Sequence, residues 1–211
     1  HTMYTNADNI ANYISSQNVD MNRTYNSTFF NFVDYREAPR QVNGDDAAQV
    51  TIVHSENYRT RFTYDSSLGQ YKMAQYYPQM GDYMDTVDEN NERQLAFDNV
   101  VVLFTDIHTY PGHEAQDLQY AEYSWGGVGY YCYGGKFRAV TWEKGNPEDP
   151  LRLKDENGAA LQVNVGKSYV AIVGKDREGT LLFGGVSPTG VIGGAVGLSG
   201  AVLTWLGRFL I

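Results

Sequence analysis

The strongest constraint on the fold comes from residues 99–173, where short apolar runs alternate with turn residues. Near the centre of this stretch, an aromatic and β-branched run over residues 130–142 is interrupted by the pair Gly134-Gly135. Two adjacent glycines accept the positive φ angles of a two-residue hairpin turn. A further hairpin turn is indicated at residues 155–158, and apolar runs typical of strands follow at residues 160–165 and 168–173. The pattern predicts an antiparallel β-sheet meander.

A second hairpin is predicted upstream. Residues 58–64 place aromatic and threonine side chains on one face and Arg59 and Arg61 on the other, which is the two-residue period of a half-buried strand. The turn-forming run 65–69 follows, so residues 70–76 are expected to return as the antiparallel partner.

The most hydrophobic run, residues 99–107, is predicted to be a central strand with both faces covered. Residues 118–125 are another strand candidate. Two stretches lack a period: residues 38–46, with Pro, Gly and Asp, are predicted to be a linker, and residues 78–91 an acidic loop.

One α-helix is predicted near the N-terminus. Thr5 is the expected cap, and Asp8 lies in the first turn, where negative charge is favoured. Ile10 and Ile14 fall on one face at helical spacing, and the helix is expected to end near residues 17–18.

These elements predict a mainly β fold, α+β overall: an antiparallel sheet meander or sandwich with one N-terminal helix and an apolar C-terminal tail. Three parts are expected: a helix and linker that are the remnant of a preceding domain (1–48), a β-rich domain (49–174) and a Gly-rich apolar tail (175–211). The predicted core residues are Val101, Leu103, Trp142, Val170 and Ile172.

Composition narrows the function classes. The formal net charge of −9 would repel a phosphate backbone, so no nucleic-acid partner is predicted. The chain has 17 tyrosines, and this residue suits half-buried sheet faces and surface grooves because its ring is apolar and its tip polar. The single cysteine, Cys132, lies in an aromatic run and is interpreted as a small buried hydrophobe.

A group of potential metal ligands follows the central strand: Asp106, His108, His113 and Glu114, around a Pro-Gly turn. Histidine and carboxylate side chains can bind zinc, and loops at strand ends often hold sites. Their spacing matches no established metal motif, however, so surface loop residues are the favoured interpretation. No cofactor and no metal are predicted, and no catalytic residues are assigned.

Aromatic residues in the run 118–125 are the candidates for ligand contact: Tyr120, Tyr123 and Trp125. Such rings offer flat apolar surface together with a hydrogen-bonding group, and both protein and carbohydrate ligands use them.

Several short motifs resemble, in order, those of a known bacterial family. They are Phe62-Thr63-Tyr64-Asp65, Gly69-Gln70-Tyr71, Asn99-Val100-Val101-Val102, Trp142-Glu143-Lys144, Pro150-Leu151, Asp155-Glu156-Asn157-Gly158 and Val165-Gly166-Lys167-Ser168-Tyr169-Val170. The chain is similar to the C-terminal domain of the YerB-like family, extracytoplasmic lipoproteins of unknown function. The resemblance covers roughly residues 1–174, including a segment at residues 1–5 that is similar to the end of the family's N-terminal domain.

The resemblance implies a place at the outer face of the cytoplasmic membrane, in the cell envelope. The motifs are mostly turn and core positions, so they carry information about the fold and little about chemistry. The chain departs from the family pattern in two ways: most of the N-terminal domain is absent, and the sequence continues beyond the point near Val173 where the pattern stops.

The continuation is unusually apolar. Residues 190–211 carry a single charged side chain, Arg208. As a helix they would span about 33 Å at about 1.5 Å per residue, enough for a bilayer core of about 30 Å. Glycines spaced by four residues and the terminal Trp205 also suit a membrane helix. Membrane association through this tail is one expectation; the other is that the Gly-rich segment packs into the sheet as further strands.

Two function classes remain open. The first is a non-catalytic extracytoplasmic module that binds a protein partner or a cell-wall glycan. The second is part of a cell-wall-acting enzyme whose site is completed by the missing N-terminal domain. A pair of side chains with perturbed pKa values in a cleft would favour the enzyme, whereas an exposed Tyr/Trp surface would favour binding.

Overall fold

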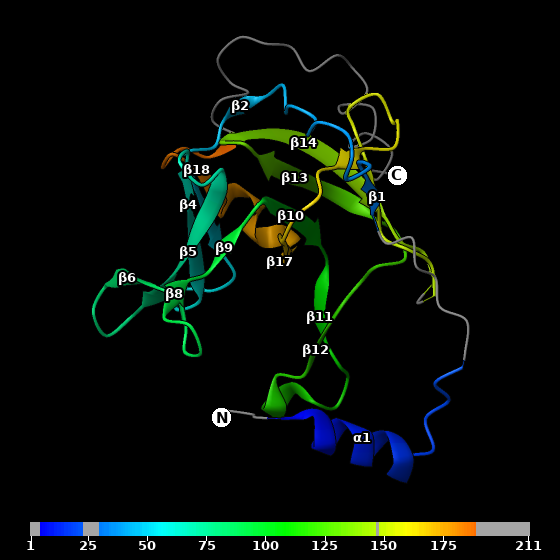
Figure 1. The fold of residues 1–211 in the computed structure, drawn as a ribbon. Coiled ribbons are helices and arrows are strands. Elements are labelled where there is room, and N and C mark those ends of the chain that lie inside the picture. The colour runs from blue at the N-terminus through cyan, green and yellow to red at the C-terminus, as the bar shows by residue number, and fades with distance from the viewer. Residues whose placement is uncertain (1–4, 23–29, 147, 189–211) are drawn as a thin grey trace, which may run out of the picture.

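The computed structural model describes residues 5–22, 30–146 and 148–188 (Figure 1). Two sheets of six strands dominate it, with three two-stranded pairs around them. The chain is therefore mainly β with one N-terminal helix, as the sequence predicts.

The first sheet has the order β15-β14-β13-β10-β17, and β2 pairs with β14 at its edge. Its strands are β2 (Asp45–Asp46), β10 (Asn99–Thr105), β13 (Gly127–Tyr133), β14 (Lys136–Glu143), β15 (Arg152–Lys154) and β17 (Ser168–Gly174). Neighbours in this sheet are antiparallel except β10 and β17, which run parallel. This parallel pair departs from a simple meander.

The second sheet has the order β18-β3-β4-β5-β6, with β9 pairing with β5, and all its pairs are antiparallel. Its strands are β3 (Gln49–Val53), β4 (Arg59–Asp65), β5 (Gln70–Tyr77), β6 (Asp82–Asp85), β9 (Ala96–Phe97) and β18 (Leu182–Phe183). The predicted hairpin over residues 58–76 is confirmed. β4 and β5 are antiparallel partners, with Asp65 opposite Gln70 at the turn.

The remaining elements are short. They are the parallel pair β1 (Asn31–Phe32) and β16 (Gln162–Val163), the antiparallel pairs β7 (Val87–Asp88) with β8 (Arg93–Gln94) and β11 (Ile107–Thr109) with β12 (Gln119–Ala121), the helix α1 (Ala7–Ser16), and the 3-10 turns η1 (Glu114–Gln116) and η2 (Lys175–Thr180). No residue of α1 is buried, and Figure 1 shows the helix apart from the two sheets.

Apolar side chains cover both faces of β10, and all seven of its residues are buried. One face, with Val100, Val102 and Phe104, packs against the second sheet through a shared core that includes Phe62 and Tyr71. The opposite face forms a second core, made by Phe30, Val101, Leu103, Tyr131, Val140, Trp142, Leu151, Leu153, Leu161 and Val163. The prediction of a central strand covered on both sides is confirmed.

The central hairpin is also confirmed. Gly134 and Gly135 join β13 to β14 with φ angles of +62° and +76°. Of the predicted core residues, Val101, Leu103 and Trp142 are buried, whereas Val170 and Ile172 are only partly buried against the second core.

Two predicted irregular stretches contain strands. In the supposed loop 78–91, Tyr83 of β6 lies opposite Tyr76 of β5, and this aromatic cross-strand pair stabilises an edge strand despite its acidic composition. In the supposed linker 38–46, Asp46 of β2 lies opposite Lys136 and forms an ion pair with it at 3.8 Å.

Two boundaries also differ from prediction. The side chain of Asn6, rather than Thr5, caps α1 by accepting a hydrogen bond from the Asn9 N–H at 2.8 Å. The strand candidate at 118–125 contains only the three residues of β12.

Of the predicted tail 175–211, residues 175–188 are described and contain η2 and β18, which pairs with β3. The predictions about residues 190–211, including membrane association, lie outside the described residues. Within residues 5–22, 30–146 and 148–188, no helix is long and apolar enough to cross a membrane. The division of the chain at residues 48 and 174 stays a prediction.

Candidate functional site

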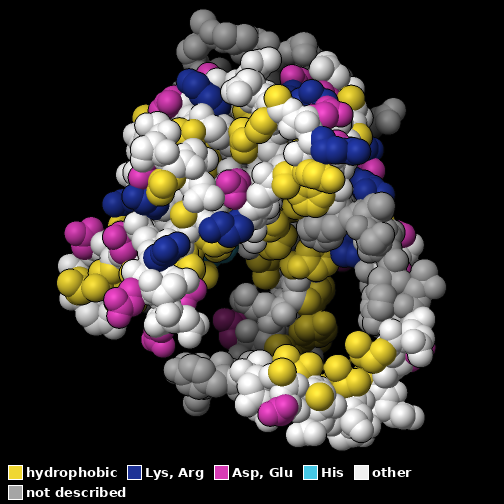
Figure 2. All heavy atoms as spheres, in the orientation of Figure 1, with side chains coloured by type: hydrophobic (Ala, Val, Ile, Leu, Met, Phe, Trp, Pro, Cys, Tyr) yellow, Lys and Arg dark blue, Asp and Glu magenta, His cyan; other side chains and the backbone are white. Residues whose placement is uncertain are grey.

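The candidate site is a projecting segment that we call the aromatic arm, residues 107–125. It contains β11, η1, β12 and the chain up to Trp125, and it extends from the end of β10 away from the two sheets (Figure 1). Figure 2 shows hydrophobic side chains continuing from the body of the molecule along this part of the chain.

Hydrogen bonds at both ends fix the arm. At its base, the Thr105 hydroxyl donates to the Glu122 carbonyl, and the Glu122 N–H donates to the Asp106 carbonyl at 2.9 Å. Toward its tip, the Tyr110 N–H donates to the Leu118 carbonyl at 2.8 Å. The arm is therefore a continuation of the buried strand β10, which gives it a rigid origin.

The three predicted ligand-contact residues all lie on this arm, in different settings. Trp125 is 77% exposed, and Tyr123 is 38% exposed with the edge of its ring against the buried Trp142 at 6.3 Å between centroids. Tyr120 is only partly exposed, because its ring packs against His108 and Tyr110 at 5.4 and 4.8 Å. Trp125 and Tyr123 thus offer accessible ring surface, while Tyr120 supports the hairpin.

Aliphatic side chains extend the apolar surface of the arm. Ile107 and Leu118 are exposed large hydrophobic residues on the same hairpin, together with Tyr110. Exposed aromatic and aliphatic side chains gathered on one projecting segment are typical of a place where another molecule binds.

The metal-ligand candidates are not brought together. The Asp106 carboxylate forms an ion pair with Lys175 at 3.7 Å, and the ring of His108 lies against Tyr120. Glu114 accepts a hydrogen bond from the Gly112 N–H at 3.0 Å, and His113 precedes the turn η1. In the part of the chain that the structure describes, no group of three or more His, Cys, Asp or Glu residues is placed to hold a metal ion.

One carboxylate of the arm is held in its charged form. Glu122 Oε1 accepts a hydrogen bond from the Ser124 N–H at 2.7 Å, and this bond holds the pKa of the carboxyl group below its usual range. The negatively charged Glu122 therefore precedes the exposed residues Tyr123 and Trp125 in the sequence.

Burial shifts the pKa values of three further titratable groups, Cys132, His54 and Tyr131. Burial raises the pKa of the Cys132 thiol strongly, so the thiol stays protonated, and its interpretation as a buried hydrophobe is confirmed. Burial lowers the pKa of His54, whose ring lies against Tyr58 at 4.9 Å. Burial also raises the pKa of Tyr131 to about 12.

Tyr131 belongs to a buried polar network with a structural role. Its hydroxyl donates to Asn99 Oδ1 at 2.8 Å and accepts from the Asn164 N–H at 3.1 Å. The Asn99 amide donates to the Asn164 carbonyl at 2.9 Å and to the Ser168 hydroxyl at 3.2 Å. Because each polar group has a partner, the network fixes the register between β10, β13 and the segment before β17.

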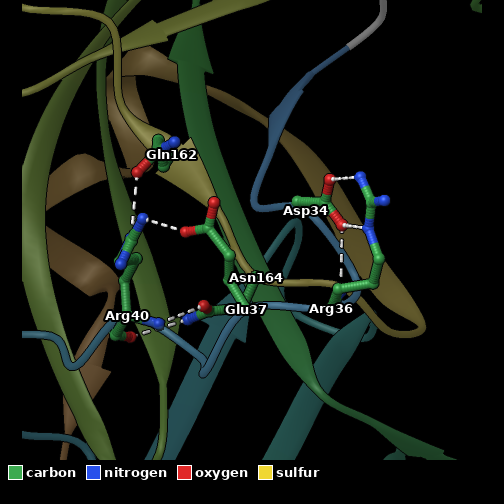
Figure 3. Close-up of polar contacts among 6 residues, drawn as sticks. All are labelled: Asp34, Arg36, Glu37, Arg40, Gln162 and Asn164. Carbon is green, nitrogen blue, oxygen red and sulfur yellow. Dashed lines mark hydrogen bonds and ion pairs between the residues drawn. The ribbon is translucent and has the colours of Figure 1, made fainter.

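A pocket of about 210 Å³ lies beside this network, next to the polar contacts drawn in Figure 3. Asn164 exchanges two hydrogen bonds with the Arg40 backbone, at 2.7 and 2.8 Å. The Arg40 guanidinium binds Glu37 and Gln162, and Arg138 on the pocket wall binds Glu156. The charge of each arginine is thus neutralised by a glutamate of the protein itself.

A second pocket, of about 360 Å³, is lined by Arg59 and Arg61 on the outer face of β4. Sequence reasoning placed these two side chains on one face but did not identify them as a site. The available signal was their alternation with Thr60 and Phe62. Tyr76 lies on the strand that the sequence predicted as the partner of β4, whereas Tyr83 lies on β6, which the sequence predicted to be a loop.

Comparison with known proteins supports the fold. A family model described as the C-terminal domain of a protein of unknown function, DUF3048, matches residues 48–170. The crystal structure of YerB from Bacillus subtilis matches with a TM-score of 0.58 at 16% sequence identity, a level that shows the fold alone. The match covers 80% of this chain and 51% of the YerB chain, so this chain spans about half the length of that relative. The search of curated proteins gave no match.

Proposed function

This chain belongs to the DUF3048 C-terminal domain family, and from that premise we propose that it is a non-catalytic binding module of the bacterial cell envelope. It would bind a protein partner or a cell-wall glycan through the aromatic arm. The observation that carries the proposal is the exposed Tyr and Trp surface on a hairpin that continues the most buried strand.

A protein partner is the favoured ligand. Ile107 and Leu118 add exposed aliphatic surface to an arm that also carries the exposed rings of Tyr110, Tyr123 and Trp125, and a mixture of aromatic and aliphatic side chains is typical of the centres of protein interfaces. A glycan is the second candidate because of Trp125, whose 77% exposure leaves a flat ring face open to a sugar ring.

The alternative, a part of a cell-wall-acting enzyme completed by a further domain, has less support. Within the described residues the thiol of Cys132 is buried and protonated, and the His54 ring lies against Tyr58 with its Nε2 atom buried and without a hydrogen-bond partner. The arm contains acidic and imidazole groups, but their observed partners fix them in structural contacts. These contacts favour binding over catalysis.

An extracytoplasmic location at the membrane surface is part of the proposal and rests on the family resemblance. An acidic chain with a projecting apolar hairpin suits contact with a partner tethered to the same surface. The tail 190–211 is a possible route of membrane association for the same module.

Two assays test the proposal. The first measures co-sedimentation of the purified chain with isolated bacterial cell-wall sacculi. The second places a photo-crosslinking amino acid at the exposed position 124, next to Trp125, and looks for one adduct of defined mass in envelope fractions. We expect Trp125→Ala to weaken binding about thirtyfold, which corresponds to about 2 kcal/mol, the lower end of the range for a hot-spot residue.

The matched control is Tyr35→Ala. Tyr35 is an aromatic residue of similar exposure, 80%, and it lies outside the arm. Equal binding of the Trp125→Ala, Tyr35→Ala and unchanged chains would refute a role for the arm. Hydrolysis of the sacculi by the purified chain would instead support the enzyme alternative.

A further inference from the structure

The second pocket has the features of a ligand site that is separate from the aromatic arm. It lies on the outer face of the β18-β3-β4-β5-β6 sheet and has a volume of about 360 Å³. Small-molecule sites usually have volumes of about 300–1,000 Å³, so this pocket is large enough and the 210 Å³ pocket is not. Its walls are formed by Gln49, Thr51, Val53, Arg59, Arg61, Tyr76, Gly81, Asp82, Tyr83, Leu182 and Gly185.

The strand register explains how the pocket forms. Phe62 points into the shared core, so its neighbour Arg61 points to the outer face of the sheet. The residue opposite Arg61 on β5 is Ala74, whose small side chain leaves room for the arginine to reach across to β6. Tyr76 and Tyr83 are themselves opposite each other and supply aromatic surface at that side.

Both guanidinium groups lie over tyrosine rings. The Arg59 Cζ atom is 4.7 Å from the centroid of the Tyr76 ring, and the Arg61 Cζ atom is 3.6 Å from that of Tyr83. This stacking is attractive and orients a planar guanidinium while leaving its N–H edge free to donate. The tyrosines therefore hold two forked donors in fixed orientations.

Neither arginine has a carboxylate partner among the described residues. Arg59 Nε donates to the Glu56 carbonyl at 2.8 Å, and Arg61 Nε is buried without an acceptor within residues 5–22, 30–146 and 148–188. A buried donor without an acceptor is costly and therefore unusual in a native protein. In the smaller pocket, Arg138 Nε is likewise buried without an acceptor among the described residues, but Arg40 and Arg138 are both paired with glutamates, which neutralise their charge.

We propose that Arg59 and Arg61 form a binding site for a ligand that carries a singly charged oxyanion, either a carboxylate or a phosphodiester. A guanidinium fork matches the geometry of both groups and binds them through two parallel hydrogen bonds. Gln49 and Thr51 on the same wall can bind neutral polar parts of the ligand.

Acidic side chains beside the arginines limit the charge of the ligand. Asp82 lines the pocket, and Asp85 lies opposite Ala74 in the register, so it shares the outer face of the sheet with Arg61. Both would repel a densely charged polyanion. This agrees with the net charge of −9, which argues against nucleic acid, and it is the reason for expecting a single oxyanion.

The test uses the whole chain and small probes. Acetate represents the carboxylate source and dimethyl phosphate the phosphodiester source, and each is titrated while the arginine Nε–Hε signals are followed by NMR. We expect the Arg61 signal to shift with at least one probe, and the tighter probe identifies the source. We expect Arg61→Gln to weaken that binding about tenfold, which corresponds to about 1.4 kcal/mol.

Further variants separate binding from folding. Arg61→Lys keeps the charge but loses the fork, so we expect it to weaken binding as well, and Arg59→Gln tests the second donor without changing Arg61. The control is Arg40→Gln, which removes an arginine that Glu37 already neutralises and should leave the titration unchanged. Thermal unfolding checks that each variant is folded.

Two results would overturn the proposal. The first is the absence of any shift of the Arg59 and Arg61 signals with either probe at low ionic strength, where exposed charge interactions are strongest. The second is equal affinity of the Arg59→Gln, Arg61→Gln and Arg40→Gln variants. Neither result would affect the proposed role of the aromatic arm, because Trp125 is not part of this pocket.

Discussion

Replacing Trp142 with alanine should destabilise the protein more than most single substitutions. The side chain is only 3% exposed and packs in the second core with Leu103 and Val140. Its indole N–H also donates to the Phe104 carbonyl at 3.1 Å, which ties β14 across β13 to the central strand. The site is tight, because a Cβ atom placed on Gly127 would lie 2.8 Å from the indole nitrogen.

The expected loss in the free energy of unfolding for Trp142→Ala is about 3–5 kcal/mol, the usual cost of truncating a buried Trp. Trp142→Phe keeps most of the apolar contact but loses the hydrogen bond to Phe104, so we expect a smaller loss of about 1–2 kcal/mol. The difference between the two variants separates the packing contribution from that of the hydrogen bond.

Urea unfolding followed by circular dichroism measures both values. With a slope of about 2–3 kcal/mol per molar urea, a loss of about 3–5 kcal/mol lowers the midpoint by about 1–2.5 M. An unchanged midpoint for Trp142→Ala would refute the assignment of this ring to the core. A phenylalanine variant as unstable as the alanine variant would refute the packing argument, since both would then lose the same interaction.

Three further predictions concern a turn, an ion pair and the thiol. Gly135→Ala should lower the melting temperature more than Gly134→Ala, because both glycines have positive φ but only at Gly135 would a Cβ clash with a neighbouring ring, at 2.8 Å. Lys72 Nζ lies 2.7 Å from the Asp65 carboxylate and lowers the pKa of that carboxyl group well below its usual 3.8. The contact therefore stabilises the folded state above about pH 4, and the stabilisation is lost as the pH falls. We expect the stability of the Asp65→Asn variant to decline less steeply than that of the unchanged chain between about pH 5 and 2. Cys132 should react with a thiol reagent at least about a thousandfold more slowly in the native than in the urea-unfolded chain, and fast native labelling would contradict its burial.

The sequence correctly predicted those elements whose conformation depends on residues close together in the chain. The pair Gly134-Gly135 identified its hairpin because only a turn with two positive φ angles requires such residues at adjacent positions. The run beginning at Asn99 identified the central strand because every residue of β10 is buried, which removes the polar alternation of a one-sided strand. Both predictions rest on physics that acts within a few residues.

Pairings between distant segments left no such signal. β17 lies parallel to β10, with Val170 opposite Val101, although β11 to β16 intervene in the chain. The apolar run of β17 is equally compatible with an antiparallel neighbour, so its direction depends on the path of the connecting segments. The buried network around Tyr131 and Asn164 stabilises that path, and its members are separated by 33 residues.

The aromatic arm shows an intermediate case. Tyr120, Tyr123 and Trp125 were recognisable as an aromatic run, but their different roles depend on the hairpin. Pairing of β11 with β12 places Tyr120 opposite His108 and buries part of its ring, whereas Trp125 lies beyond the last paired residue and stays exposed. Composition identified the surface, and the strand register decides which rings a ligand can reach.

The second pocket, lined by Arg59 and Arg61, could not be predicted because its two halves come from segments with different sequence signals. β4 alternates clearly, and this fixes Arg59 and Arg61 on the outer face. β6 is acidic and short, so its pattern indicates a loop, yet Tyr83 of this strand holds the Arg61 guanidinium. A loop would leave that arginine free to move and to pair with Asp82 or Asp85. The pairing of β6 with β5 instead holds Arg61 over an aromatic ring, where its Nε–H group has no acceptor among the described residues, and this is the property from which the oxyanion site follows.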